Sequence, residues 1–526
     1  MERKGSITVF FSLSLTIVIT LICTTIETVR LNGLQQQLDM AADSALDSMF
    51  ASYDRQLLEQ YGLLFLNGSG GNDKYSDLYL KNQMEEYMKY EMTPTLDTSF
   101  IGTTMYPMKL EDIRILNTVR TTDFGGNVFE QEVIDYMKYK EVGDITDQLL
   151  NWKTLMEKGN DQSKKIEEAE KTLNQTDWEN QSKEEEISKT TLNIVEHNII
   201  KNGMQQDETA NETEQETEEN LFDQQRYDKE IESSVIHQVQ EVKKGGFLKI
   251  VVPEQIPISG KQIKTEKLPS MTSVTELEWN NRSIAEKTAR AVLYGEYVLK
   301  HFSNFISDEK KSGIQYETEY ILFGKNSDEE NLKSCINRLL WIREGLNIAH
   351  IFSSTAKMEE ALGMATAMVG WAMIPPLVTA VQLVIVGSWA YAESLLDVRR
   401  LLSGKKVTLI KTEQSWQLGL SGLKDFFYGA GQNENNDENG LGYEDYMRVL
   451  LLTVDKSEKI YRTMDIVQQN MQQSVPNFEM KNYVYSAQIC VEAEANQLFL
   501  MFPGVRKMWN RSNEKYRIIT AVGRNY

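Results

Sequence analysis

The sequence has few of the residues on which enzyme and metal chemistry most often depend. Its 526 residues include only four histidines and three cysteines. The histidines form no HExxH motif of the zinc proteases, and no Gly-x-Ser-x-Gly segment of the serine hydrolases lies between a strand pattern and a helix pattern. The cysteines show neither CxxC nor zinc-ligand spacing. We therefore predict no catalytic residue, no metal ligand and no cofactor-binding residue.

The cysteines and two of the histidines are better explained as structural residues. Cys23 lies in an apolar run, Cys335 in a helical pattern and Cys490 in a strand pattern. Cys335 and Cys490 could form a disulfide in an oxidising exterior, but separate buried thiols are favoured because free cysteine is among the most buried residue types. For His301 and His350, both in helical patterns, we expect partly buried imidazoles with a hydrogen-bond partner.

Basic residues are too few to balance the acidic ones. Lys and Arg number 56 against 77 Asp and Glu, which gives a net charge of −21. This charge opposes nonspecific binding to nucleic acid or to an anionic membrane surface. We predict that nucleic acid is not a partner, whereas 41% apolar residues can supply hydrophobic cores.

An uncharged segment near the N-terminus predicts a membrane anchor. Arg3 and Lys4 precede a stretch from Gly5 to Ile26 without a charged residue. A helix of this length reaches about 33 Å, close to the ~30 Å hydrocarbon thickness of a bilayer. A cleaved signal would have a shorter apolar core and a small-residue cleavage site, and neither is evident. We predict that residues 1–26 form a short cytoplasmic end and a retained transmembrane helix.

The charges on either side of this segment predict its orientation. Arg3 and Lys4 lie on the near side, and acidic residues dominate the far side: Glu27, Asp39, Asp43 and Asp47. Because cytoplasmic flanks favour Lys and Arg, we expect a single-pass protein of the cell membrane with a cytoplasmic N-terminus and an extracytoplasmic bulk.

The helical pattern continues beyond the span and predicts a stalk helix over 27–66. Apolar residues recur every three or four positions from Leu31 onward, as one helix face requires. We assign a helix-packing or interaction role to five residues of this face: Leu34, Leu38, Ala41, Ala45 and Met49. The alternative is that the face packs against the protein's own outer domain.

The beginning of the chain resembles a known family. The segment GSITVFF at residues 5–11, the uncharged span and the segment LDMAADSAL at residues 38–46 are similar to the start of the TadE/TadG-like proteins of Flp-type (tight-adherence) pilus systems. The resemblance covers about the first 50 residues. It implies a membrane-anchored, pseudopilin-like component of a pilus or secretion apparatus. Residues 320–351 and 363–411 resemble uncharacterised membrane-anchored proteins of Gram-positive anaerobes.

One position departs from the pilin pattern. Pilins and related pseudopilins commonly have a glutamate five residues after the processed glycine, whereas counting from Gly5 gives Phe10. The missing carboxylate would neutralise the new amino terminus of a neighbouring subunit, and a buried charge is costly unless it is paired. A permanent anchor therefore fits the sequence better than a cleaved subunit.

The remainder predicts an α+β protein: an N-terminal transmembrane helix and stalk, then a largely helical extracytoplasmic region with small antiparallel sheets. We expect a first α+β unit over 67–156, a charged and partly disordered insertion over 157–245, and a second α+β unit over 246–526. In the insertion, Ile166, Leu173 and Trp178 are too sparse to form a core.

Several shorter elements follow from local patterns. Strands are expected at 108–119, 247–252, 316–323, 483–500 and 516–522, the last two as an antiparallel pair. Ser327 and Glu330 form a capping-box signature that starts a helix running to about Phe352. On this helix Arg343 lies near the apolar stripe. It is either a buried ion-pair partner or a side chain that extends to water, and the second interpretation is favoured.

Residues 361–392 are uncharged and contain Pro375 and Pro376. They form either a buried helical hairpin or a second membrane element. The pieces on either side of the prolines are too short to span a bilayer, which favours a core hairpin at 361–402. Glu359, Glu360 and Glu393 then mark helix ends that emerge into water, although a run of basic residues from Arg399 to Lys411 would also suit a cytoplasmic flank.

These patterns predict a membrane-anchored extracytoplasmic structural or assembly protein that acts by helix packing and is not an enzyme. Its partners would be the membrane and the proteins of a pilus or secretion apparatus, and its oligomeric state is left open. The alternative is a membrane-tethered hydrolase of the cell envelope, although no carboxylate pair stands apart as a site. A deep cleft with convergent carboxylates would favour the enzyme, and an exposed apolar stalk face would favour assembly.

Overall fold

The computed structural model describes residues 4–72, 74–92, 106–140, 145–175, 235–253, 255–271, 283–308, 313–370, 373–423, 426, 436–499 and 515–526. The chain divides into two compact units. Unit 1 comprises Met1–Glu141, Lys264–Ser283 and Ile460–Tyr526, and unit 2 comprises Val142–Ile263 and Ile284–Lys459. The predicted α+β class is confirmed, because the described residues are mainly helical and include a small antiparallel sheet.

The sheet of unit 1 is built around one long strand from the C-terminal part of the chain. This strand, β3 (Tyr483–Asn496), pairs antiparallel with β2 (Lys109–Arg120) along one edge and with β4 (Lys515–Asn525) and the short β1 (Leu66–Asn67) along the other. The predicted antiparallel pair near the C-terminus is therefore confirmed. The strand expected at 108–119 is a single strand, with register shifts after Leu110, Ile115 and Val119.

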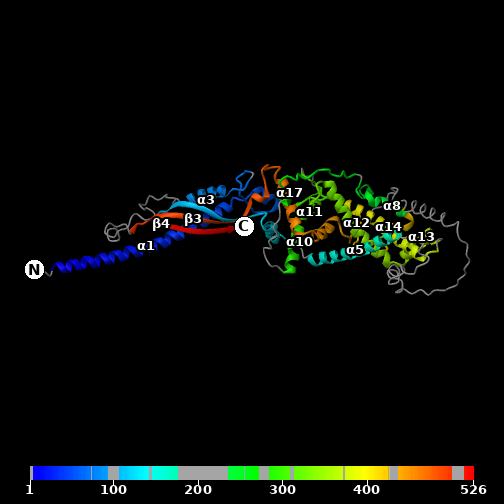
Figure 1. The fold of residues 1–526 in the computed structure, drawn as a ribbon, viewed down its shortest axis with the longest axis horizontal. Helices are drawn as coiled ribbons and strands as arrows, with labels where there is room; N and C mark the ends of the chain where they lie inside the picture. The colour runs from blue at the N-terminus through cyan, green and yellow to red at the C-terminus, as the bar shows by residue number, and fades with distance from the viewer. Residues whose placement is uncertain are drawn as a thin grey trace. The chain divides into compact units, whose positions relative to one another are not determined.

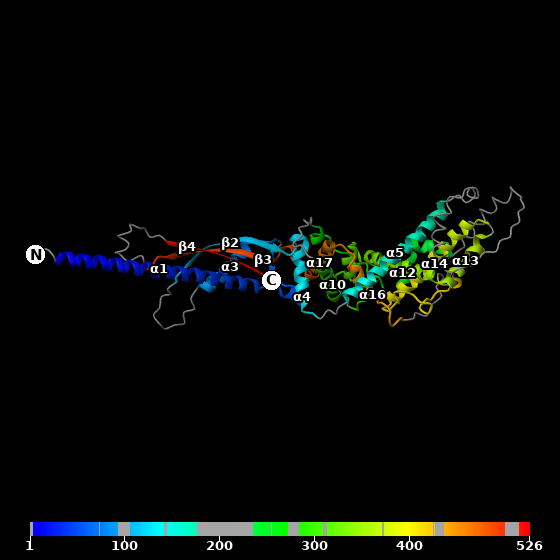
Figure 2. The ribbon, with the colours of Figure 1, turned by 90° about the horizontal axis from the view of Figure 1, so that it is seen from below.

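A long helix lies along this sheet. Helix α1 (Lys4–Phe50) packs against β4 and against α3 (Asp77–Met92), and α3 in turn packs against β2 (Figure 1). The strands β2, β3 and β4 are seen beside α1 in a second view as well (Figure 2). Because both helices contribute side chains to the cluster that includes alternate residues of β3, the hydrophobic core of unit 1 lies between helices and sheet.

The predicted stalk helix is interrupted. Helix α1 ends at Phe50, and the separate helix α2 (Arg55–Tyr61) is capped by Asp54, whose carboxylate accepts a hydrogen bond from the Leu57 amide at 3.1 Å. Gly62, with a φ of 68°, ends α2 in the left-handed conformation that glycine adopts without strain. The aspartate cap and the glycine cap explain why one helical pattern forms two helices.

Shorter elements complete unit 1. They are η1 (Phe124–Gly126), α4 (Asn127–Lys138), η5 (Pro269–Met271), η8 (Met480–Asn482) and most of α17 (Lys456–Met471). An aromatic cluster joins Phe65 to Phe129 and Tyr485. Segments from both ends of the chain therefore share one core, which differs from the sequence-based boundaries at 67–156 and 246–526.

Unit 2 is helical. Helices α12 (Asp328–Ser353) and α14 (Pro375–Leu402) pack against each other, α5 (Thr146–Gln175) lies against both, and α13 (Thr355–Val369) packs against α14. The remaining elements are α8 (Val235–Glu241), the π-helical turn η4 (Val242–Gly246), α9 (Phe247–Val251), α10 (Ile284–His301), α11 (Glu317–Phe323), η7 (Leu420–Gly422) and α16 (Tyr443–Leu451).

Two predicted strands are wrong, because both segments are helices. Residues 247–252 form α9, in which Phe247 and Val251, four positions apart, are buried. Within residues 316–323, Glu317–Phe323 form α11, which is capped by Gly324 in the left-handed conformation. A segment of only six to eight residues is too short to reveal the period of its apolar positions, so strand and helix cannot be told apart by this pattern alone.

The predicted insertion over 157–245 is partly structured. Its first part continues α5 to Gln175, where Ile166 and Ala169 are buried, so the sparse apolar residues do contribute to a core. Its last residues, from Val235, form α8 and η4. The predicted disorder between these elements, including Trp178, falls on residues 176–234, which lie outside the described part of the chain.

The segment 361–402 is a pair of packed helices, α13 and α14. Although α14 is long and apolar enough to cross a membrane, 78% of its apolar window is buried inside the protein. The core-hairpin interpretation therefore agrees with the structure. Glu393, expected at a helix end in water, is instead completely buried in the middle of α14.

Candidate functional site

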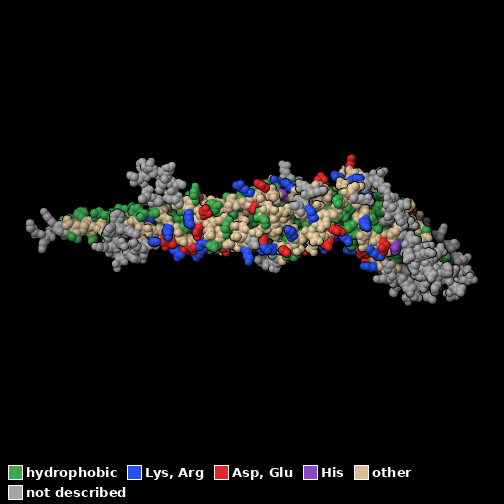
Figure 3. All heavy atoms as spheres, turned by 90° about the horizontal axis from the view of Figure 1, so that it is seen from above, with side chains coloured by type: hydrophobic (Ala, Val, Ile, Leu, Met, Phe, Trp, Pro, Cys, Tyr) green, Lys and Arg blue, Asp and Glu red, His purple; other side chains and the backbone are tan. Residues whose placement is uncertain are grey.

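The first part of α1 presents an exposed apolar surface. Eleven of its large apolar side chains between Ile7 and Ile22 are exposed, among them Phe10, Phe11 and Leu21, each at 67%. Figure 3 shows hydrophobic side chains covering this end of the helix. Helix α1 is long and apolar enough to cross a membrane, and only 6% of its apolar window is buried.

Sequence reasoning missed a buried ion pair directly after this segment. Glu27 and Arg30 are 2% and 1% exposed, and the Arg30 Nη1 lies 2.9 Å from the Glu27 Oε1. The same Nη1 donates to the Asn496 carbonyl at 3.0 Å, and the Glu27 Oε2 accepts from the Phe499 amide at 2.9 Å. We call these four residues the anchor junction, because they join the end of the apolar segment to the end of β3.

The anchor junction also changes the charge argument for orientation. Glu27 is neutralised by Arg30, so it adds no free negative charge to the far flank. The spacing of three residues between an acid and a base on one helix was the available signal. The remaining acidic stripe, Asp39, Asp43 and Asp47, still follows the span, and Asp47 is ion-paired with Arg524 of β4.

The five residues assigned to helix packing lie together in the core of unit 1. Leu34, Leu38, Ala45 and Met49 are completely buried, and Ala41 is 7% exposed. Their neighbours in this cluster come from α3 and from the sheet. The face therefore packs inside the protein, which is the intramolecular alternative, and it is not available to a partner helix. Ser69, an apparent loop residue, is also buried and bonded to Asn67.

Unit 2 contains a buried network of charged side chains. Arg343 of α12 donates through Nε and Nη2 to the Asp397 Oδ2 of α14, at 3.0 and 2.8 Å. Lys411 lies 2.7 Å from the other oxygen of Asp397 and 2.6 Å from a Glu393 oxygen. Arg400, also buried, pairs with Asp437 at 3.0 Å. Arg343 is thus a buried ion-pair partner, and the expectation that it extends to water is wrong.

The cations decide the ionisation of Asp397. Burial alone would raise its pKa, but Arg343 and Lys411 lower the pKa below the ordinary value of 3.8. For Glu393 burial outweighs Lys411, so its pKa is raised. The polar groups around the network are bonded as well, since Asn347 donates to Ser394 Oγ and Arg343 donates to two backbone carbonyls. Such a network fixes how α12, α14 and the segment 408–411 pack.

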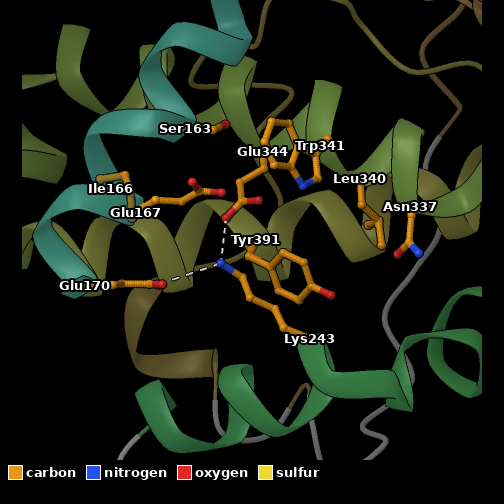
Figure 4. Close-up of a pocket in the computed structure, with 10 residues that line it drawn as sticks. All are labelled: Ser163, Ile166, Glu167, Glu170, Lys243, Asn337, Leu340, Trp341, Glu344 and Tyr391. Atoms are coloured by element: carbon orange, nitrogen blue, oxygen red, sulfur yellow. Dashed lines mark hydrogen bonds and ion pairs between the residues drawn. The ribbon is translucent and has the colours of Figure 1, made fainter. Parts of the chain in front are cut away.

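A pocket of about 220 Å³ opens between α5, η4, α12 and α14 of unit 2 (Figure 4). Ten residues line it: Ser163, Ile166, Glu167, Glu170, Lys243, Asn337, Leu340, Trp341, Glu344 and Tyr391. Lys243 lies 3.0 Å from Glu344, 3.7 Å from Glu170 and 5.0 Å from the centre of the Tyr391 ring. Lys243 projects from the π-helical turn η4, a type of turn that is often found at functional sites.

The charges in this pocket are coupled. Burial raises the pKa of Glu344, although Lys243 opposes this effect. Burial would lower the pKa of Lys243, but Glu344 and Glu170 together raise it. At neutral pH Lys243 is therefore an ammonium ion held between two acidic side chains. Within the described residues, no group of three or more His, Cys, Asp or Glu could hold a metal ion.

The comparison with known families concerns the part of the chain that forms the buried network. A family model described as "Family of unknown function (DUF5702)" matches residues 225–495. The chain belongs to the DUF5702 family. The DUF5702 region contains Lys243, Arg343, Glu344 and Asp397, but it contains neither α1 nor α5. No curated protein and no solved structure is detectably similar to the chain.

The predicted structural cysteines and histidines can now be located. All three cysteines are free and buried, as predicted, with Cys335 on α12 and Cys490 on β3. His350, whose side chain is 10% exposed, stacks on Trp416, and its Nε2 lies 3.5 Å from a Glu413 oxygen without a hydrogen bond. His301 packs against Tyr297.

Proposed function

We propose that this DUF5702 protein is a membrane-anchored structural component of an extracytoplasmic assembly, of the pseudopilin-like kind that the N-terminal resemblance implies. One observation carries the proposal. Helix α1 is a single helix of 47 residues whose first part is apolar and exposed and whose second part is buried in the core of unit 1. An anchor and an outer unit that share one helix move together.

The anchor junction supports this proposal. Glu27 follows the uncharged segment immediately, and it holds the backbone beside Phe499. If the segment before it spans a bilayer, the ends of β3 and β4 lie in the headgroup layer, which extends roughly 5–8 Å beyond the hydrocarbon core. The ion pair between Glu27 and Arg30 neutralises two buried charges, each of which would be costly at this depth if it were unpaired. One end of the sheet is then held at the membrane surface.

A stripe of hydroxyl residues on α1 supplies a surface for assembly inside the membrane. Ser12, Thr16, Thr20 and Thr24 recur every four residues, and each hydroxyl donates to a carbonyl three or four positions earlier. Small residues with this spacing let helices approach closely in membranes, where hydroxyl groups also bond across helices. Because the stalk face is buried in unit 1, assembly through helix packing would use this membrane stripe instead.

The proposed orientation predicts labelling from outside the cell. Ser69 is unsuitable as a reporter because it is buried, whereas Asn72 in the same loop is exposed. We expect Asn72→Cys to react with a membrane-impermeant thiol reagent on intact, wall-permeabilised cells. The parent protein, whose three cysteines are buried, provides the background. Labelling that requires lysis would reverse the orientation and would contradict the extracytoplasmic role.

The proposed assembly predicts a position-specific effect in the membrane. We expect the double variant Thr16→Leu with Thr20→Leu to form about tenfold less of any complex that is larger than the monomer after mild detergent extraction. The reason is that interhelical hydrogen bonds in membranes contribute ~0.6–1.7 kcal/mol each. Native gels of membranes from the source cells measure the effect. The matched control, Val18→Leu with Ile22→Leu, changes exposed residues on the opposite side of the helix. A monomeric parent protein, or an equal loss in the control, argues against assembly through this stripe.

The alternative class, a membrane-tethered hydrolase, finds less support. The pocket does bring three carboxylates together, from Glu167, Glu170 and Glu344. Two of them are ion-paired with Lys243, so no free acid faces a free base as glycoside hydrolysis requires. The pocket is better explained as a binding site.

A further inference from the structure

The pocket of unit 2 has hydrogen-bonding groups that the protein itself does not use. Ser163 is 5% exposed, and its hydroxyl has no hydrogen-bond partner although it lines the pocket. Glu167, one turn further along α5, forms no ion pair in the described part of the chain. A buried hydroxyl without a partner is costly in a folded protein. Both groups are therefore available to a ligand.

The charge of the pocket selects a cation. Three carboxylates, those of Glu167, Glu170 and Glu344, surround one ammonium group, that of Lys243. In Figure 4 the carboxylates of Glu167 and Glu344 point toward one another above the Lys243 amine. An anion would meet an excess of negative charge here, whereas a cationic ligand would offset the two carboxylates in excess over the ammonium group.

The aromatic residues indicate an organic cation rather than a metal ion. Trp341 is 40% exposed at the pocket, which is unusual for so large an apolar side chain. The Tyr391 ring already lies beneath the Lys243 ammonium, which shows that an aromatic face in this pocket accepts an alkylammonium group. Among the described residues, no three or more His, Cys, Asp or Glu side chains are arranged so that they could hold a metal ion.

We propose that this pocket binds a compact alkylammonium ion, with its amine bonded to Glu167 and to the Ser163 hydroxyl and its alkyl chain against Trp341. The size of the ligand follows from the 220 Å³ volume. Because a cavity of about 150 Å³ holds benzene, a ligand of fewer than about ten non-hydrogen atoms fits. A linear diamine of four or five carbons has this size and charge.

Calorimetry on the full chain in detergent or nanodiscs tests the proposal, with 1,4-diaminobutane as the probe at low ionic strength. We expect a Kd of about 1 mM or below. Glu167→Gln should weaken binding about tenfold, since it removes one charge-assisted hydrogen bond. Ser163→Ala should weaken it about threefold, since a neutral hydrogen bond contributes less.

The controls separate a specific site from general attraction to an acidic protein. Glu168→Gln makes the same charge change one residue further along α5, outside the pocket, and should leave the Kd within twofold. The neutral 1,4-butanediol should not bind at the same concentrations. The proposal is overturned if the diamine does not bind at about 10 mM, if both glutamate variants weaken it equally, or if equimolar Mg²⁺ displaces it. None of these outcomes depends on the membrane role.

Discussion

Asp397→Asn should lower the free energy of unfolding of unit 2 by about 3–5 kcal/mol, the range found when one partner of a buried ion pair is removed. Asp397 is completely buried and accepts hydrogen bonds from Arg343 and Lys411. The amide keeps the shape of the carboxylate but not its charge. Lys411 then keeps Glu393 as an ion-pair partner, whereas Arg343 loses the carboxylate with which it is paired.

Urea unfolding followed by tryptophan fluorescence measures this loss, because Trp389 and Trp416 both lie in unit 2. The matched control is Asp161→Asn on the exposed side of α5, which should change the unfolding free energy by less than about 0.5 kcal/mol. The pKa of Asp397 is lowered below 3.8, so its contribution is fully present above about pH 4 and is lost as the pH falls further. The variant and the parent protein should therefore converge in acid.

A second substitution distinguishes charge from packing. In Asp397→Asn with Lys411→Met, one of the two cations that contact Asp397 is also removed, so the double variant should be less destabilised than the sum of the single ones. Additive losses, or a loss in Asp397→Asn no larger than in Asp161→Asn, would show that the network contributes little.

The sequence predicted those elements whose signals are local. The uncharged span and the face from Leu34 to Met49 gave α1, and Ser327 gave the start of α12, where its hydroxyl accepts from the Glu330 amide at 3.3 Å. Asp54 and Gly62 are local signals for the start and the end of α2, but the apolar pattern that continues through this region predicted one uninterrupted helix. Short apolar runs such as α9 carry no period that separates strand from helix.

The arrangement of unit 1 could not be predicted from local signals. Strand β2 pairs with β3, for example Ile113 with Val491, although most of the chain lies between them. The sequence of neither strand identifies the strand with which it pairs, because the alternation of side chains specifies only which residues face the core. The expected division into successive units therefore differs from the observed one.

The buried network was missed for a related reason. Arg343 and Asp397 are on different helices, and Lys411 follows on a separate segment. A charged residue is usually exposed, so the sequence gives no reason to place any of the three inside the protein. Only the fold shows that their opposite charges are buried together and neutralise one another. The same holds for the pocket, where Ser163, Lys243 and Glu344 come from three segments.

Ala45→Glu should unfold unit 1, with a loss of about 4 kcal/mol or more in its free energy of unfolding. Ala45 is completely buried in the cluster shared by α1, α3 and the sheet, and a carboxylate there loses its water without gaining a partner. Limited proteolysis of the full chain, with the fragments assigned to each unit, measures the effect. We expect rapid cleavage within unit 1 while unit 2 stays resistant.

The matched control for Ala45→Glu is Met40→Glu, which introduces the same side chain on the same helix at a position that is 72% exposed. It should leave the proteolytic pattern unchanged, as should Asp47→Asn, which removes only a partly exposed ion pair with Arg524. If unit 1 of Ala45→Glu stays resistant while the larger membrane complex is lost, the stalk face binds a partner helix after all. Cleavage of unit 1 together with retention of the anchor in the membrane supports the intramolecular role of this face and leaves the membrane stripe from Ser12 to Thr24 as the surface for assembly.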